Sequence, residues 1–125
     1  MVFADLLKQM VVKVDGAIGA LIMGLDGIAI EQQLSDEAGD EEGDRLAIIA
    51  AAYATLLRNS MRTSSDVGVG QLEELTIISG NMILVIKLIN SEYFLILALE
   101  AKGNIGRARF ELRKAQLLIE EEFTF

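Results

Sequence analysis

The stretch from Asp44 to Arg62, DRLAIIAAAYATLLRNSMR, decides how the rest of the chain is arranged. It contains neither Gly nor Pro and is rich in Ala and Leu, so it predicts a helix of about five turns. Asp44 is the expected N-cap, because its carboxylate can accept hydrogen bonds from the free amides of the first turn. One large apolar face results, made of Leu46, Ile49, Tyr53, Leu56 and Leu57.

A second row of small side chains runs beside that face. Ala47, Ala51 and Ala54 form it, and it leads to Arg58. Small side chains let another helix approach to roughly 8 Å. A helix with so little polar surface needs cover on two sides. The sequence therefore predicts a sheet against one side and a partner against the other; the alternative is a central helix inside a larger core.

Composition limits the classes of function. The 125 residues predict a single domain, 1–125, and the hydrophobic content of 52% predicts a subunit interface as well as a core. The net charge of −8 argues against nucleic acid as a partner. The chain has no Cys and no His, so it lacks a thiol nucleophile, the commonest general base and the commonest metal ligand.

These absences lead to further expectations. The serines have no His to activate them, and neither catalytic residues nor a metal or cofactor are expected. Arg58 and Arg62 lie four apart on the helix and share one face. They are expected to form surface ion pairs or polar contacts at an interface, and an arginine finger directed at a partner's phosphates is the less favoured alternative. No signal peptide or run of about 20 apolar residues is present, so a cytoplasmic protein without a membrane span is expected.

The chain before the central helix predicts a helix and a hairpin. Val2–Val14 has apolar residues at helical spacing, and a membrane-surface helix is the less favoured alternative. Ala17–Met23 and Ile28–Gln33 are strand-like runs around a glycine-flanked turn, and the first has no polar side chain, so it should be central. The acidic run Ser35–Asp44 predicts a solvated loop, because its spacing does not fit a Ca²⁺-binding loop.

The chain after the central helix predicts a meander and a final helix. Leu72–Ser79, Met82–Leu88 and Tyr93–Leu99 are three strand candidates separated by turn residues. Asn104 is the expected cap of a helix over Ile105–Glu122, which holds the only basic cluster of the sequence. The predicted order is therefore helix, two strands, helix, three strands, helix.

With this order in place, the whole chain resembles the roadblock/dynein light chain family, in particular its bacterial MglB-like branch. The resemblance lies in the stretch VDGAIGALIMGLDGIAIEQQ, in the acidic loop before LAIIAAAYATLLRNS, and in the segment from LEELTIISGNMILVIKL to GNIGRARFELRKA. It implies an α+β, three-layer α/β/α, profilin-like fold with a five-stranded antiparallel sheet. It also implies a homodimer, and a non-catalytic role in binding or activating a Ras-like small GTPase of the MglA type.

The implied dimer gives expectations for individual residues. We expect the dimer interface to contain Ala47, Ala51, Ala54, Arg58, Leu72 and Thr76. The outer positions of the central helix are the expected docking surface for the GTPase: Ile48, Ala52, Thr55, Asn59 and Arg62. A purely structural dimerisation scaffold and a small-molecule sensor are the alternative functions.

Overall fold

The computed structural model describes residues 3–122 and has three helices and five strands over that range. In chain order they are α1 (Phe3–Lys13), β1 (Ala17–Gly24), β2 (Ala29–Leu34), α2 (Asp40–Asp66), β3 (Glu74–Ile78), β4 (Met82–Leu88), β5 (Tyr93–Glu100) and α3 (Ile105–Glu122). The predicted order of elements is confirmed. Val2, where the first helix was expected to begin, lies outside the described residues.

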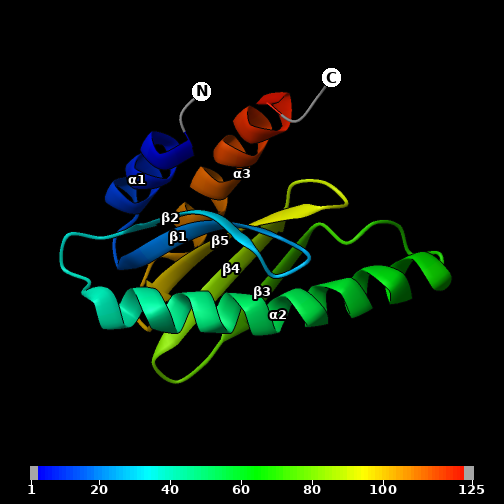
Figure 1. The fold of residues 1–125 in the computed structure, drawn as a ribbon, viewed down its shortest axis with the longest axis horizontal. Coiled ribbons are helices and arrows are strands. Elements are labelled where there is room, and N and C mark those ends of the chain that lie inside the picture. The colour runs from blue at the N-terminus through cyan, green and yellow to red at the C-terminus, as the bar shows by residue number, and fades with distance from the viewer. Residues whose placement is uncertain (1–2, 123–125) are drawn as a thin grey trace.

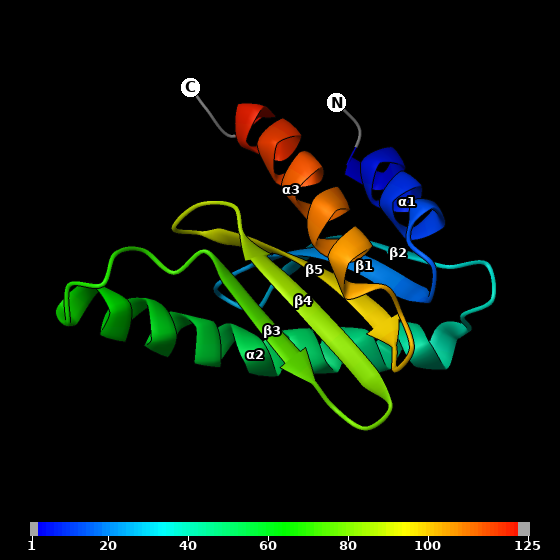
Figure 2. The same cartoon turned by 180° about the vertical axis from the view of Figure 1, so that it is seen from behind.

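The elements form three layers around one antiparallel sheet. The strand order is β2-β1-β5-β4-β3, so β2 and β3 are the edges. Helices α1 and α3 lie side by side over one face, and α2 runs across the other (Figures 1 and 2). The expected three-layer α/β/α arrangement is therefore confirmed.

The three interior strands, β1, β5 and β4, are those with the most continuous apolar sequence. Strand β1 pairs with β2 on one side and with β5 on the other, as in the partners Leu21 and Ile96. Alternate side chains point to opposite faces of a strand and so feed two separate cores. Ile22 and Leu97 join the core under α1 and α3, whereas Leu21 and Ile96 join the core under α2.

The ends of the final helix and of β4 match the sequence-based prediction. Helix α3 covers Ile105–Glu122 and β4 covers Met82–Leu88, as expected. The predicted cap is present too, because the Asn104 side-chain oxygen accepts a hydrogen bond of 3.0 Å from the Arg107 amide.

Helix α2 starts four residues before the predicted start, at Asp40, so Asp44 is not its N-cap. The cap is Gly39, whose amide donates to the Glu42 carboxylate at 2.9 Å. Asp40, Glu41 and Glu42 occupy the first turn, where negative charge is favourable beside the free amides. Only the first half of the predicted acidic loop is therefore a loop. The helix also runs four residues further than expected, to Asp66.

The sheet-facing side of α2 differs from the predicted face. Its buried side chains are Leu46, Ala50, Ala54 and Leu57. Leu56, which was expected on this face, is 42% exposed, and Ala54 is fully buried in its own protomer. Compared with the side that the sheet buries, the predicted apolar face of α2 was therefore displaced around the helix axis, by a fraction of a turn, toward the β3 edge.

The junction between β1 and the start of α3 depends on one glycine. Gly16 has φ +84°, and a Cβ there would lie 2.8 Å from the Gly103 Cα. Gly27, in the β1–β2 turn, has φ +88° but no atom within 4 Å of its Cβ position. We expect Gly27→Ala to cost about 1 kcal/mol of unfolding free energy, from the backbone alone. Gly16→Ala should cost about 3 kcal/mol, because a clash with backbone adds to the same strain.

Urea denaturation of the two variants checks this difference. Because both positions have almost the same φ, Gly27→Ala is the matched control for the backbone term. Equal midpoints for the two variants would contradict the close approach of Gly16 to Gly103.

Candidate functional site

Helix α2 does not cover its face of the sheet evenly. It packs most closely over β1 and β2, and β3 lies at the opposite edge. Figure 2 shows β3 and the β3–β4 turn on the near side of the sheet, with α2 crossing behind them at an angle. Apolar side chains on β3 that point toward the α2 layer therefore remain partly exposed.

Together with one flank of α2, these side chains make up an apolar strip at the margin of the α2-side core. Leu75 and Ile77 of β3 are half-buried at the margin of the α2-side core, as are Ile49 and Tyr53 on α2. Leu56 extends the strip along the helix. We call this strip the α2–β3 surface, made of Ile49, Tyr53, Leu56, Leu72, Leu75, Ile77 and Met82.

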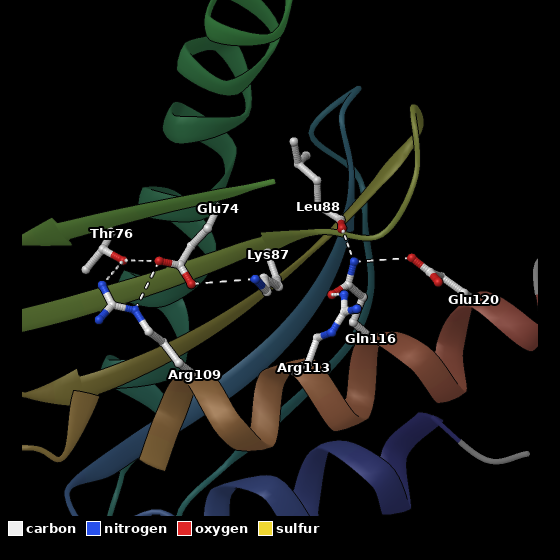
Figure 3. Close-up of polar contacts among 8 residues, drawn as sticks. All are labelled: Glu74, Thr76, Lys87, Leu88, Arg109, Arg113, Gln116 and Glu120. Atoms are coloured by element: carbon white, nitrogen blue, oxygen red, sulfur yellow. Dashed lines mark hydrogen bonds and ion pairs between the residues drawn. The ribbon is translucent and has the colours of Figure 1, made fainter. Parts of the chain in front are cut away.

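The opposite face of β3 is held to α3 by a polar network. The Glu74 carboxylate accepts a hydrogen bond from the Arg109 side chain at 3.0 Å and lies 3.7 Å from the Lys87 ammonium (Figure 3). The Thr76 hydroxyl donates to Glu74 at 3.3 Å and accepts from Arg109 at 3.4 Å. Because strand side chains alternate, these contacts direct Leu75 and Ile77 to the α2 side.

A second network fixes the far half of α3. The Gln116 amide group donates to the Leu88 carbonyl at 3.0 Å and to the Glu120 carboxylate at 3.2 Å. Its oxygen accepts a hydrogen bond of 3.2 Å from Arg113 (Figure 3). Gln116 is buried, so these bonds satisfy a polar group that would otherwise be costly to remove from water. This network ties the far half of α3 to the end of β4, the strand next to β3.

The outer surface of α2 points away from the sheet. All five side chains predicted for docking are exposed, and Ile48 is 70% exposed. They follow one stripe of the helix because they are spaced three and four residues apart. We call this stripe the α2 crest: Ile48, Ala52, Thr55, Asn59 and Arg62.

Arg58 lies on the flank of α2 nearer to the β1–β2 turn. Its guanidinium donates to the Leu25 carbonyl through Nη1 and to the Thr55 hydroxyl through Nη2, the latter at 3.1 Å. The side chain therefore bridges the helix to the β1–β2 turn. This tether gives the guanidinium a positioning role within its own chain.

The structure separates the residues that were expected at the dimer interface. Ala47, Ala51 and Arg58 lie on the flank of α2 away from β3, whereas Leu72 precedes β3. The side chain of Thr76 takes part in the network with α3, on the opposite face of β3 from Leu75. Ala54 has no exposed surface. These residues therefore do not form one patch.

The residues that do form a patch were only partly visible in the sequence. Ile49, Tyr53 and Leu56 were assigned to the sheet-facing side of the helix, because the apolar period alone does not say where the sheet ends. Leu75 and Ile77 alternate with Glu74 and Thr76, which is the pattern of a strand with one apolar face. Because this strand lies at the edge of the sheet, its apolar face lies on the same side as the flank of α2 that carries Ile49, Tyr53 and Leu56.

Among residues 3–122, no three Asp or Glu side chains converge to form a group suited to a metal ion. Over the same range, no helix is both long and apolar enough to cross a bilayer. The α2–β3 surface and the α2 crest adjoin each other on helix α2.

Comparison with solved structures shows which known proteins this chain resembles. The chain is similar to MglC from Myxococcus xanthus, with 30% identity over 94% of this chain and 96% of that one, at a TM-score of 0.70. It also superposes on the gliding protein MglB from Thermus thermophilus, at a TM-score of 0.81 and 15% identity, covering 94% of this chain and 84% of that one. The latter identity supports the fold alone.

Curated relatives and a family model extend the comparison. Protein MJ1340 of Methanocaldococcus jannaschii is 27% identical over 89% of this chain and 91% of its own length. The Roadblock/LC7 domain model matches residues 3–99, which include the α2–β3 surface and the α2 crest. The chain therefore belongs to the Roadblock/LC7 domain family, with the MglB and MglC proteins among its structural neighbours.

Proposed function

We propose that this chain is a non-catalytic homodimeric regulator that binds a Ras-like small GTPase of the MglA type. The observation that carries the proposal is the α2–β3 surface, an apolar strip bounded by an edge strand with unpaired backbone groups. An edge strand and an apolar flank are a template for pairing with another chain. A second copy related by a two-fold axis can cover both the edge strand and the apolar flank, because each subunit presents the same strip to the other.

In such a dimer the two α2 crests form the docking surface for the GTPase. The crest lies outside the apolar strip, so dimerisation leaves Ile48 accessible. The crest begins with apolar Ile48 and Ala52 and continues with polar Thr55, Asn59 and Arg62, and this mixture of apolar and polar side chains suits a reversible interface. Membership of a family that includes MglB and MglC supports a GTPase as the partner.

Two measurements test this proposal. Sedimentation of the purified protein at micromolar concentration should give a dimer. Immobilised protein should then retain a small GTPase from a lysate of the source cell, and retention should depend on whether a GTP analogue or GDP is added. Capture of a large assembly regardless of nucleotide would favour the structural scaffold, and GTP hydrolysis by the purified chain alone would contradict a non-catalytic role.

Arg58 separates positioning from direct participation in hydrolysis. Because its guanidinium is bound to the Leu25 carbonyl, we expect Arg58→Ala to weaken GTPase binding about threefold to tenfold through the β1–β2 turn. Hydrolysis at saturating protein, if the dimer stimulates it, should remain largely unchanged. A loss of about 10³ in the stimulated rate would instead identify an arginine finger. Single-turnover hydrolysis with purified GTPase distinguishes the two results.

A further inference from the structure

The outward side of α3 carries an apolar and basic surface that neither the core nor the α2 layer uses. Phe110 is 54% exposed, and Leu117 and Leu118, about two turns further along the helix, are also exposed. Three cationic side chains lie among them. We call this surface the α3 ridge: Arg107, Phe110, Arg113, Lys114, Leu117 and Leu118.

The aromatic ring at the centre of the ridge is held in place by two cations. The Arg107 guanidinium and the Lys114 ammonium each lie 5.4 Å from the centroid of the Phe110 ring. Both cations also form ion pairs with the buried Glu111 carboxylate, at 3.7 Å for Arg107 and 3.5 Å for Lys114. Such preorganisation lowers the entropy lost when a ligand binds.

The charge of the ridge is opposite to that of the whole chain. Four of the eleven Lys and Arg residues lie in α3, within a protein of net charge −8. Arg109 is paired with Glu74 on the β3 side, and Glu111 offsets one of the remaining three cations. The ridge therefore keeps a local positive charge around Phe110, before the three glutamates at the end of the helix, and this part of it is complementary to a ligand that is acidic and amphipathic.

We propose that the α3 ridge binds an acidic amphipathic segment of another protein. Phe110 and Leu117 are seven residues apart on one line of the helix, about 10.5 Å along its axis. Apolar side chains of the segment would contact these two residues, and carboxylates between and beside them would meet Arg107, Arg113 and Lys114. The proposal is independent of dimerisation and GTPase binding, because the ridge lies on the opposite side of the sheet from α2.

The end of α3 favours a peptide over an extended anionic surface. Glu121 follows Leu117 by four residues on the same line of the helix, and Glu120 and Glu122 flank it. A flat bilayer in contact with Leu117 and Leu118 would also bring its anionic headgroups next to these carboxylates, and the like charges would repel each other. A peptide can end before them, so like charges need not meet.

Fluorescence anisotropy with a labelled synthetic peptide tests this. The probe has two Leu residues seven apart on one helical face, with Glu at the neighbouring positions of that face. We expect micromolar binding that weakens as salt is raised, because charge pairs at the rim are screened. Phe110→Ser should weaken binding about tenfold, as expected for an aromatic anchor, and Lys114→Gln about threefold. Val12→Ser, which alters another exposed apolar residue of the same layer, should leave binding unchanged.

Four results would overturn the proposal. A scrambled peptide of the same composition that binds equally would show attraction by charge alone. Unchanged binding by Phe110→Ser and Lys114→Gln would place the peptide elsewhere. Binding to vesicles of phosphatidylglycerol and phosphatidylcholine without binding to the peptide would make the ridge a membrane contact. Loss of an oligomer in Phe110→Ser, without peptide binding by the unaltered protein, would make it a contact between copies.

Discussion

Ile48→Asp should abolish binding of the GTPase while the homodimer survives. Ile48 is 70% exposed and lies on the α2 crest, on the opposite side of the helix from Leu46 and Ala50, which pack against the sheet. The substitution therefore changes little in the folded chain itself. In a complex it would place a carboxylate in a desolvated apolar contact. We expect affinity to fall at least a hundredfold, or about 3 kcal/mol.

Val12 provides the matched control for this variant. It is 73% exposed and lies on α1, in the layer on the other side of the sheet. Val12→Asp introduces the same charge at an equally exposed apolar position and should bind the GTPase as the unaltered protein does. Calorimetric titration measures both affinities, and sedimentation reports the oligomeric state of each variant. A monomeric Ile48→Asp protein would assign the crest to the dimer interface, and undiminished binding would remove the crest from the docking surface.

The order of elements was predictable because local signals agreed with the global arrangement. Strand β1 has no polar side chain and lies inside the sheet between β2 and β5, and Asn104 capped α3 as its short side chain predicts. The start of α2 was not predicted, because Gly39 and Gly43 within an acidic run have the composition of a loop. Gly43 is in fact helical, and its small size lets α2 approach β2: a Cβ there would lie 2.9 Å from the Leu34 side chain.

The candidate site was less predictable than the fold. A helical wheel identifies which residues of α2 are apolar, but not which of them the sheet covers, and this depends on where α2 crosses the sheet. Ala54 and Leu56 were therefore assigned to the wrong sides. Thr76 was expected at the dimer interface, yet its hydroxyl bonds Glu74 and Arg109 on the α3 side. That contact joins residues more than thirty positions apart, for which the sequence carries no local signal.

Leu56→Asp should convert the proposed homodimer into monomers. Leu56 is 42% exposed on the α2–β3 surface, so its replacement removes little from the core of the protomer. In a two-fold dimer the substitution occurs twice, once in each copy of the same surface. Two carboxylates would then lose solvent within one apolar interface, each without a cationic partner. We expect the dissociation constant to rise by a factor of about 10² to 10³.

Leu118→Asp is the control that makes this result specific. Leu118 is 41% exposed, is also a helical leucine, and lies on α3 across the sheet from α2. Both substitutions add one negative charge to a chain of net charge −8, so general repulsion between subunits is the same in both. Sedimentation over a range of concentrations should give a monomer for Leu56→Asp and a dimer for Leu118→Asp. Dimers from both variants would exclude the α2–β3 surface as the interface, and monomers from both would show that charge, not position, controls association. Because a dimer is stabilised by mass action, the melting temperature of the unaltered protein and of Leu118→Asp should rise with concentration, whereas that of Leu56→Asp should not.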